Sequence, residues 1–314
     1  MPAISHYVLD ARTATDHFPG IGRYVVNLAR ALAQDAPDLN LSLLDDPSTG
    51  TGLTLPDLPC IACHASPFSL RQQWAVPREL RRARATLYHS PYYLMPYRPG
   101  VPTMLTVYDL IPLLFPRHST ARARLCFRWA TALALRAAEH VIAISQATRR
   151  DLLAAYHVPP AQVTAIHLAA DLAFSPRSAA EVETVRRKYS LPEQFVLYLG
   201  SNKPHKNLAR LIEAWAHITR HVLAFRLVIA GAWDPRYPEP RRHAEALGVE
   251  HITWLGPIAE ADLPALYSAA DLFVFPSLYE GFGLPLLEAL ACGAPVACSN
   301  TSSLPEVAGE AALY

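Results

Sequence analysis

Short apolar runs alternate along the chain with segments in which apolar residues recur every three or four positions. Runs of this length are typical of buried β-strands, and the recurring spacing is typical of a helix that buries one face. Strands are expected at residues 7–9, 103–107, 140–144, 163–167, 195–200, 225–230, 251–256 and 273–275, and helices at 25–32, 125–138, 208–218 and 261–270. Five apolar residues predict one buried helix face after residue 207, namely Leu208, Leu211, Ile212, Trp215 and Ile218. Because strands and helices alternate, the pattern predicts an α/β fold with parallel sheets.

The length of the chain predicts two domains. Its 314 residues suffice for two hydrophobic cores. The crossing between them is expected within residues 170–176, with the boundary near Ser175, which gives domains of residues 1–174 and 175–314. Residues 35–60 are polar and rich in turn-forming residues, and the run Asp45-Asp-Pro-Ser-Thr-Gly-Thr-Gly within them predicts a surface loop.

The charge balance argues against a nucleic-acid-binding protein. The chain has 28 Lys and Arg against 27 Asp and Glu, so it lacks the strong positive excess of such proteins. Hydrophobic residues make up 51% of the chain, yet the apolar runs are short and interrupted by charge. Neither a membrane-spanning helix nor a signal peptide is visible, so a cytoplasmic location is expected. The odd number of cysteines fits a reducing compartment.

One cysteine pattern matches a known cofactor motif. The run Cys60-Ile-Ala-Cys63-His64 has the C-x-x-C-H form of c-type haem attachment. That attachment needs export, which nothing in the sequence indicates, so a chance match is the favoured interpretation. No other cluster of metal ligands is visible, and we expect neither a metal nor a resident cofactor.

The most informative stretch joins a predicted strand, a glycine-bearing turn and a helix. Pro276 ends the strand, and Pro285 suits the first turn of a helix, where a missing N–H is not needed. Gly281 and Gly283 lie between the two prolines and let the backbone approach a ligand closely. The free N–H groups of the first helical turn favour an anion such as a diphosphate.

Two carboxylates flank this turn. Glu280 precedes the glycines, and Glu288 lies about one turn into the helix. Both can face the crevice at the carboxyl end of the strand, where carboxylates accept hydrogen bonds from the hydroxyls of a sugar. The alternative is a solvated surface glutamate and a second one stabilised by the helix dipole.

These residues resemble the E-x7-E signature of the retaining glycosyltransferases of family 4. Proteins of this family have the GT-B fold of two facing Rossmann-like domains. The run Gly281-Phe282-Gly283-Leu284 follows the first glutamate, and residues 300–309 are also typical of the family. The resemblance implies that Glu288 holds the ribose of the nucleotide and that Glu280 contacts the transferred sugar. It also implies that the backbone amides of residues 281–284 hold the distal phosphate.

The segment Gly200-Ser-Asn-Lys203-Pro-His205-Lys206 resembles the donor-diphosphate loop of the same family. The resemblance implies that Lys206 binds phosphate oxygens and that Gly200 lies beside the donor. Some relatives carry an arginine directly after the glycine, where this chain has Ser201. Whether Lys203 or His205 compensates for that arginine stays open.

Two segments of the first domain also resemble the family. Gly20-Ile-Gly22 follows the first predicted strand, but the third glycine of the dinucleotide fingerprint is absent, and a simple turn is the alternative. The resemblance implies that this glycine loop faces the donor and the acceptor. Tyr108-Asp109-Leu-Ile-Pro-Leu resembles the family's His-Asp-Leu-Ile-Pro-Leu, with Tyr108 where a histidine beside the transferred sugar is usual. Asp109 is a catalytic candidate, although an aspartate that caps its own turn is the ordinary alternative.

Residues 70–97 mix basic and aromatic side chains. Such a mixture can hold an anionic membrane surface or a lipid diphosphate, and an arginine-faced helix followed by a strand is the alternative. The residues concerned are Arg71, Trp74, Arg78, Arg81, Arg82, Arg84, Tyr88, Tyr92, Tyr93 and Tyr97.

The resemblance implies transfer of a hexose, with mannose from GDP-mannose as the expectation, to a saccharide or lipid-linked acceptor in polysaccharide assembly. A family member would continue beyond Tyr314, so the second domain is expected to be incomplete. Two alternatives stay open, namely a catalytically silent nucleotide-sugar binder and an epimerase or hydrolase of the same fold. A dehydrogenase ranks last because neither glycine segment has the dinucleotide spacing.

Overall fold

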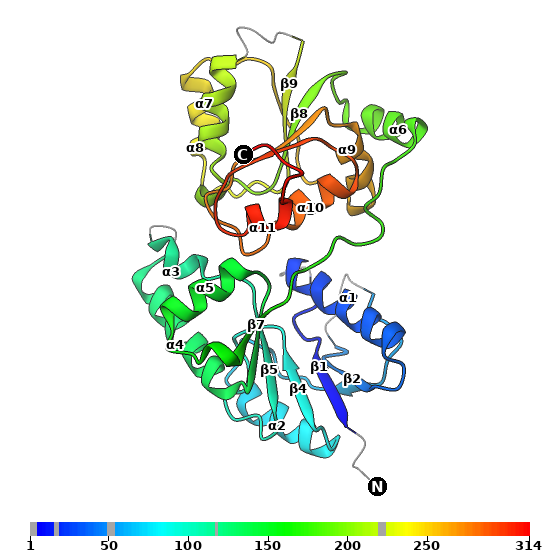
Figure 1. Ribbon diagram of the computed structural model, residues 1–314, viewed down its shortest axis with the longest axis vertical. Helices are drawn as coiled ribbons and strands as arrows, with labels where there is room; N and C mark the ends of the chain where they lie inside the picture. The colour runs from blue at the N-terminus through cyan, green and yellow to red at the C-terminus, as the bar shows by residue number, and fades with distance from the viewer. Residues whose placement is uncertain (1–4, 16–18, 49–53, 117–118, 219–223) are drawn as a thin grey trace. The chain divides into compact units, whose positions relative to one another are not determined.

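The computed structural model describes residues 5–15, 19–48, 54–116, 119–218 and 224–314, and the chain divides into two compact units. Unit 1 comprises residues 1–144 and 148–166, and unit 2 comprises residues 145–147 and 167–314. The predicted boundary at Ser175 lies eight residues after the start of the main segment of unit 2 at His167. Each unit is a parallel sheet with helices on its faces, which confirms the predicted pair of Rossmann-like α/β domains (Figure 1).

Unit 1 contains a sheet in the order β3-β2-β1-β4-β5-β6-β7. All of its pairings are parallel, and the strand order reverses between β1 and β4, which is the position of a topological switch point. The strands are β1 His6–Asp10, β2 Asn40–Asp45, β3 Cys60–Ala62, β4 Leu87–Ser90, β5 Thr103–Val107, β6 His140–Ala143 and β7 Val163–Ala165.

The helices of unit 1 cover both faces of this sheet. Side chains of β1 alternate between two cores, because Val8 packs with α2, α4 and α5 whereas Tyr7 and Leu9 pack with α1. The helices are α1 Pro19–Asp35, α2 Gln72–Arg82, α3 Ile111–Leu114, α4 Ala121–Ala137 and α5 Gln146–Ala155, with the 3-10 turn η2 Pro160–Gln162. Therefore α2 and α4 lie on one face of the sheet and α1 lies on the other.

The description of residues 35–60 as polar and turn-rich missed a strand, and the surface loop expected from Asp45 begins later, because Asp45 and Asp46 are buried. Residues 40–45 form β2, whose side chains from Leu41 onward are buried, and Asp45 and Asp46 are buried at its end. The strand was missed because it lies inside a parallel sheet, where apolar and polar positions do not alternate regularly.

Unit 2 contains a parallel sheet in the order β10-β9-β8-β11-β12. The strands are β8 Phe195–Leu199, β9 Arg226–Ala230, β10 Ile252–Trp254, β11 Leu272–Phe275 and β12 Val296–Cys298. The helices are α6 Ala179–Tyr189, α7 Leu208–Ile218, α8 Glu239–Ala246, α9 Leu263–Ala269, α10 Leu284–Ala291 and α11 Leu304–Ala308, with 3-10 turns η3 Pro204–Lys206 and η4 Glu260–Asp262. Four of the five predicted face residues of α7 are buried, but Ile218 is 45% exposed because it lies at the end of the helix.

A buried histidine couples the stability of unit 1 to pH. His89 of β4 is 1% exposed, contacts the Tyr7 hydroxyl through Nδ1, and has the Thr106 hydroxyl 2.7 Å from Nε2. Burial lowers the pKa of His89 to about 4. The folded protein therefore keeps this imidazole neutral at pH values where the unfolded chain protonates it.

The unfolding free energy is expected to fall as the pH is lowered from about 6.5 to about 4, by up to roughly 3 kcal/mol from this group. Above that window His89 is neutral in both states and contributes no pH dependence. Urea unfolding at several pH values should show a flatter acid limb in His89→Gln, which cannot take up the proton. Identical limbs in the wild type and the variant would contradict this coupling.

Candidate functional site

The glycine turn of unit 2 opens α10 as predicted. Gly283 is the N-cap residue with φ of 104°, and Pro285 follows in the first helical turn. A Cβ atom at Gly283 would lie 2.8 Å from a methyl carbon of Leu304. The backbone conformation therefore favours glycine at this position, and an added Cβ would also displace the Leu304 side chain.

Lys206 and Glu280 lie together beside this turn. The Lys206 Nζ donates to Glu280 Oε1 at 2.6 Å, and the two side chains are 18% and 10% exposed. Lys206 ends η3 after β8, whereas Glu280 follows β11, the strand that pairs with β8. Two adjacent parallel strands thus deliver a cation and a carboxylate to the same edge of the sheet.

Hydrogen bonds to backbone carbonyl groups hold the loop after β8 against the loop after β11. The Asn207 side-chain amide donates to the carbonyl oxygen of Pro276 at 3.1 Å, and the Leu278 N–H donates to the carbonyl oxygen of His205 at 2.7 Å. Asn207 has φ of 58°, a conformation that asparagine tolerates better than most residues. These hydrogen bonds fix the backbone on which Lys206 and Glu280 stand, so the two side chains start from fixed positions.

Glu288 is buried on α10. Glu288 is 5% exposed, and its Oε2 accepts a hydrogen bond of 3.2 Å from the Tyr267 hydroxyl. Tyr267 belongs to α9 and is fully buried. The alternative of a solvated surface glutamate is wrong for Glu280, which is 8% exposed. The alternative of a first-turn glutamate stabilised by the helix dipole is wrong for Glu288, which lies beyond the first turn of α10.

Two serines that the sequence analysis did not single out fix the turn. The Ser303 hydroxyl lies 2.7 Å from the carbonyl oxygen of Phe282 and 3.0 Å from that of Glu280, and it can donate to either. The Ser302 hydroxyl accepts from the N–H of Glu280 at 2.9 Å. Both serines lie in segment 300–309, which resembles the family, but the resemblance gave neither serine a role.

Gly200 directly follows β8, at a point where two backbone segments approach closely. A Cβ at Gly231 would lie 2.3 Å from the Gly200 carbonyl oxygen, and Gly200 donates its N–H to Ala230. Beyond Gly200, Asn202 is buried and its amide donates to the carbonyl oxygens of Asp234 and Tyr237. The donor-loop candidate Gly200 thus begins a loop that hydrogen bonds hold in place.

The two candidates for replacing the missing arginine have different environments. His205 is 5% exposed, whereas Lys203 is exposed. Of the two, Lys203 is the side chain that solvent and a dissolved ligand can reach.

In unit 1, Gly20 and Gly22 lie within α1 rather than in the expected loop. Pro19 is the first residue of this helix, and its fixed φ suits that position. Phe18, which precedes it, falls outside the described residues. The loop prediction is therefore wrong, while the role of the two glycines in donor binding stays a prediction.

Tyr108 and Asp109 follow β5. The Tyr108 hydroxyl is buried and has no hydrogen-bond partner among the described residues, and burial raises the pKa of this phenol. The Tyr108 ring packs edge-on against that of Tyr24, with 5.6 Å between ring centres. Asp109 accepts from the Ile111 N–H at 2.9 Å and so caps the turn into α3, as the ordinary alternative supposed.

The basic and aromatic residues of segment 70–97 divide into exposed and buried sets. Trp74 on α2 is 67% exposed, and Leu70 is 80% exposed. Tyr88 is fully buried in β4, where its hydroxyl donates to Asp10. Tyr88 is therefore unavailable to a membrane or a lipid diphosphate, and that part of the expectation is wrong.

Within the described part of the chain, no group of three or more His, Cys, Asp and Glu side chains could hold a metal ion. The described helices also include none that is long and apolar enough to cross a membrane. Cys60 of the C-x-x-C-H run is exposed at the start of β3, and Cys63 is buried.

Comparison with protein families matches both units. Residues 19–174 match the model described as Glycosyltransferase Family 4, and residues 181–312 match the one described as Glycosyl transferases group 1. O-antigen chain mannosyltransferase B of Escherichia coli is 34% identical over 250 residues, which cover 77% of this chain and 63% of that protein. The chain thus spans less than two thirds of the length of this curated relative.

Solved structures of low sequence identity share the fold. Sucrose-phosphate synthase from Thermosynechococcus elongatus matches with a TM-score of 0.74 and 23% identity, covering 98% of this chain and 85% of that one. HepE of Anabaena in complex with UDP-glucose matches with a TM-score of 0.72 and 20% identity, covering 96% of this chain and 82% of that one.

Proposed function

Because the chain belongs to the glycosyltransferases with the GT-B fold, we propose that it transfers a hexose from a nucleotide diphosphate sugar to a hydroxyl group. We further propose that the anomeric configuration is retained. The observation that carries the proposal is the Lys206–Glu280 pair beside the glycine-opened start of α10. A cation and the N–H groups at the start of a helix suit a leaving diphosphate, and a neighbouring carboxylate suits sugar hydroxyls.

In this proposal Lys206 and the amides of residues 281–284 bind the diphosphate. Glu288 binds the ribose, and Glu280 contacts the transferred sugar. Transfer of a glycosyl group needs mainly positioning and stabilisation of the leaving group in a site that excludes water. A fixed lysine and a helix N-terminus supply positive potential there, so we expect transfer to proceed without an added metal ion.

From unit 1, we propose that Asp109 and Tyr108 act on the transferred sugar. The turn that Asp109 caps follows the carboxyl end of β5, the edge of a parallel sheet at which ligands bind. Gly20 and Gly22 are proposed to face the donor through the first turn of α1, whose N–H groups have no intrahelical partners.

We propose mannose as the sugar, GDP-mannose as the donor, and a saccharide or lipid-linked saccharide as the acceptor. The similarity to a mannosyltransferase named for the O-antigen chain supports the sugar and the class of acceptor. HepE, whose complex contains UDP-glucose, shares only the fold, so it does not favour a uridine donor here.

A donor panel tests this proposal. Thermal unfolding is measured with GDP-mannose, UDP-glucose and UDP-galactose, and release of the nucleoside diphosphate is measured with and without a mannose oligosaccharide acceptor, at several EDTA concentrations. GDP-mannose should raise Tm most and should yield an α-linked product in the presence of EDTA. If none of the three donors raised Tm, the proposed function would be refuted. A β-linked product would refute retention of the anomeric configuration.

The second candidate is a silent nucleotide-sugar binder. The observation that favours it is Tyr108, whose hydroxyl is buried where the family usually has a histidine. Calorimetry would then detect donor binding while no acceptor yields product. An epimerase or hydrolase would instead convert the donor alone into an isomer or a free sugar.

A further inference from the structure

Two aromatic rings at the carboxyl edge of the unit 1 sheet stand at an angle to each other and form what we call the aromatic corner. Phe68 lies in the loop after β3, and Tyr92 lies in the loop after β4. Their ring planes make an angle of 69°, with 6.3 Å between the ring centres. Phe68 is 56% exposed and Tyr92 is half-buried, so a dissolved ligand can reach this corner.

Tyr92 is fixed by the core of unit 1. The Ser90 hydroxyl donates to the carbonyl oxygen of Tyr92 at 2.7 Å, and the Tyr92 hydroxyl donates to that of Tyr93 at 3.3 Å. The centre of the Tyr93 ring lies 4.4 Å from that of Tyr92 and 4.9 Å from that of Phe127, which is buried on α4. This wall of the aromatic corner is therefore preorganised, which lowers the entropy cost of binding a ligand.

A buried ion pair holds the loop after β3, which carries the other ring. Arg12 donates to the two carboxylate oxygens of Asp10 at 2.9 Å and 2.6 Å, and both side chains are almost fully buried. The same guanidinium donates to the carbonyl oxygen of Ala65 at 2.6 Å. Gln72, buried at the start of α2, donates its side-chain amide to the carbonyl oxygen of Pro67. The loop is thus tied both to the end of β1 and to α2.

Asp109 is near enough to the aromatic corner for its charge to act on it. Burial raises the pKa of Tyr92 and of Tyr93, and the negative charge of Asp109 adds to the rise in both. Asp109 follows β5, which pairs with β4. The loops after β3, β4 and β5 therefore bring two aromatic rings, phenol hydroxyls and a carboxylate to one edge of the sheet, where ligands of such folds bind.

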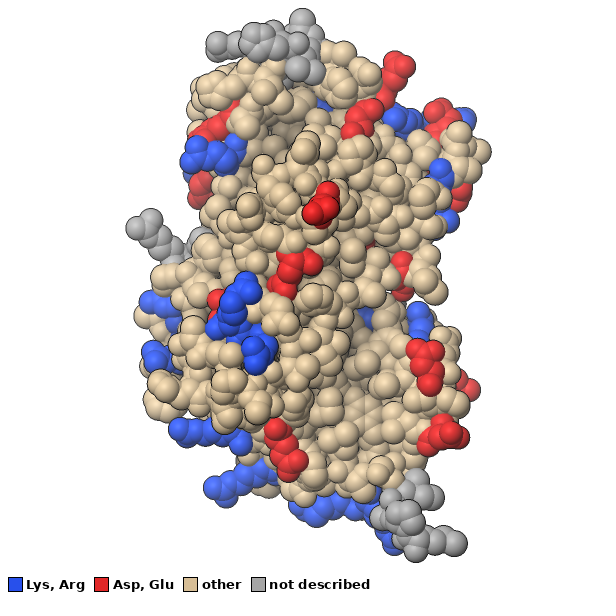
Figure 2. Space-filling view, viewed as in Figure 1, with Lys and Arg blue, Asp and Glu red and all other residues tan. Residues whose placement is uncertain are grey.

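This combination of groups suits a neutral sugar ring. A pyranose presents C–H bonds on its faces, which pack against an aromatic ring, while its hydroxyls exchange hydrogen bonds with phenols and carboxylates. Phe68, Tyr92 and Asp109 include no cation, so a phosphate or an acidic sugar would find no opposite charge among them. Charged side chains of both signs are scattered over both units on the face drawn in Figure 2, in keeping with the net charge of +1.

We propose that the aromatic corner binds a neutral pyranose ring of the acceptor. The Phe68 ring packs against the C–H bonds of that sugar, and the Tyr92 hydroxyl exchanges a hydrogen bond with it. The inference rests on the proposed function, which places Asp109 at the transferred sugar and so makes the neighbouring corner the place of the acceptor. A lipid chain is a poorer occupant, because it would cover the phenol and the carboxylate without offering a hydrogen bond.

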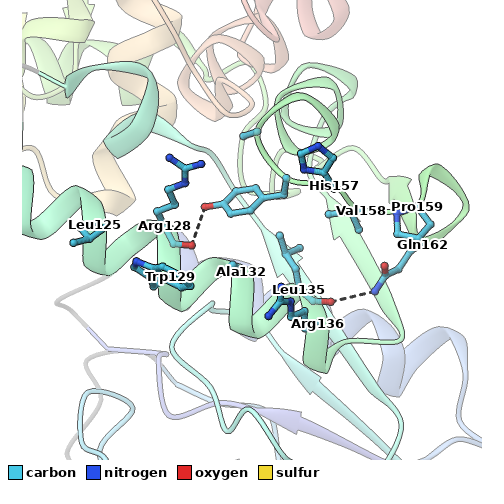
Figure 3. Close-up of a pocket in the computed structure, with 12 residues that line it drawn as sticks. Leu125, Arg128, Trp129, Ala132, Leu135, Arg136, His157, Val158, Pro159 and Gln162 are labelled. Atoms are coloured by element: carbon cyan, nitrogen blue, oxygen red, sulfur yellow. Dashed lines mark hydrogen bonds between the residues drawn. The ribbon is translucent and has the colours of Figure 1, made fainter.

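A groove elsewhere on unit 1 provides a control position. It has a volume of about 560 Å³ and lies between α4 and residues 155–162 (Figure 3). None of its lining residues belongs to the loops after β3, β4 or β5. Trp129 lines this groove and is 62% exposed, close to the value for Phe68. Trp129→Ser therefore removes an equally exposed aromatic ring that is not part of the aromatic corner.

The test is steady-state kinetics of the full chain with GDP-mannose as donor and mannotriose as acceptor. Phe68→Ser should raise the acceptor KM about tenfold, because it removes one aromatic wall, while kcat and the donor KM change less than about twofold. Phe68→Trp keeps an aromatic ring and should retain the wild-type KM. Leu70→Ser, at an 80% exposed position of the same loop, and Trp129→Ser are the controls and should match the wild type.

Saturation-transfer NMR with mannotriose, with and without GDP, separates a failure of this inference from a failure of the proposed function. Saturation transfer that is lost in Phe68→Ser and kept in Phe68→Trp would support the sugar site even if no product forms. Product formation with equal acceptor KM in the wild type and Phe68→Ser would overturn the site and leave the transferase function intact.

Two further outcomes would overturn the proposal. An equal rise of the acceptor KM in Leu70→Ser would indicate a general apolar surface, such as one for a lipid chain, instead of a sugar site at the aromatic corner. Absence of saturation transfer to mannotriose in the wild type would overturn it whatever the donor panel shows. Thermal unfolding of each variant confirms that it is folded.

Discussion

Lys206→Ala is expected to reduce product formation by about 10²-fold or more and to destabilise unit 2 at the same time. The rate falls because the variant removes the cation proposed to stabilise the leaving diphosphate. Stability falls because Glu280, 8% exposed, loses the partner 2.6 Å away. The loss from leaving a partly buried carboxylate unpaired is up to about 3 kcal/mol. Steady-state kinetics with GDP-mannose and urea unfolding measure the two effects.

Two further variants separate the effects. In Lys206→Met/Glu280→Gln no charge is left unpaired, so most of the stability should return while product formation stays low. Lys188→Ala is the matched control, because Lys188 and Asp262 are also 2.6 Å apart but the lysine side chain is 52% exposed. That change should leave both stability and rate close to the wild type. A stable and active Lys206→Ala variant would remove Lys206 from the site.

The Lys206–Glu280 pair also has a consequence for donor binding. Without a donor, the carboxylate neutralises the lysine that is proposed to receive the diphosphate. Binding must then replace this contact with phosphate oxygens and leave Glu280 free to accept hydrogen bonds from the sugar. The exchange keeps Lys206 paired in both states, which limits the free-energy cost of holding a charge in a half-buried position.

The elements that sequence predicted well are those whose pattern reports burial directly. The strand at residues 103–107 and the helix at 208–218 have the predicted bounds. Their apolar residues are those that pack into a core, so the pattern of apolar positions marks where each element begins and ends. The turn before α10 was predictable for another reason: glycine adopts the positive φ found at residue 283, and proline at residue 285 has a fixed φ that suits the first helical turn.

The parts that the sequence did not predict depend on neighbours distant along the chain. Residues 40–45 became a strand because β1 and β3 pair with them on both sides, which their own composition does not reveal. Tyr88 was grouped with surface aromatics, yet its hydroxyl meets Asp10, 78 residues away. The roles of Ser302 and Ser303 follow from contacts across more than 20 residues.

Glu288→Ala is expected to weaken donor binding by about 10- to 100-fold, the range for the loss of hydrogen bonds to a charged group. The change also leaves the buried Tyr267 hydroxyl without the acceptor that Oε2 provides. Glu288→Gln separates these effects, because its amide oxygen can still accept from Tyr267 while the negative charge is absent. Calorimetric titration with GDP-mannose and with GDP measures the affinities.

Both ligands should lose affinity to a similar extent, since the ribose is common to them and the sugar is not. Glu245→Ala, at an exposed position of α8, serves as the control and should bind like the wild type. A variant that loses affinity for GDP-mannose but not for GDP would move Glu288 from the ribose to the transferred sugar. Unchanged affinity for both ligands would mean that the buried carboxylate serves only to hold α9 against α10 through Tyr267.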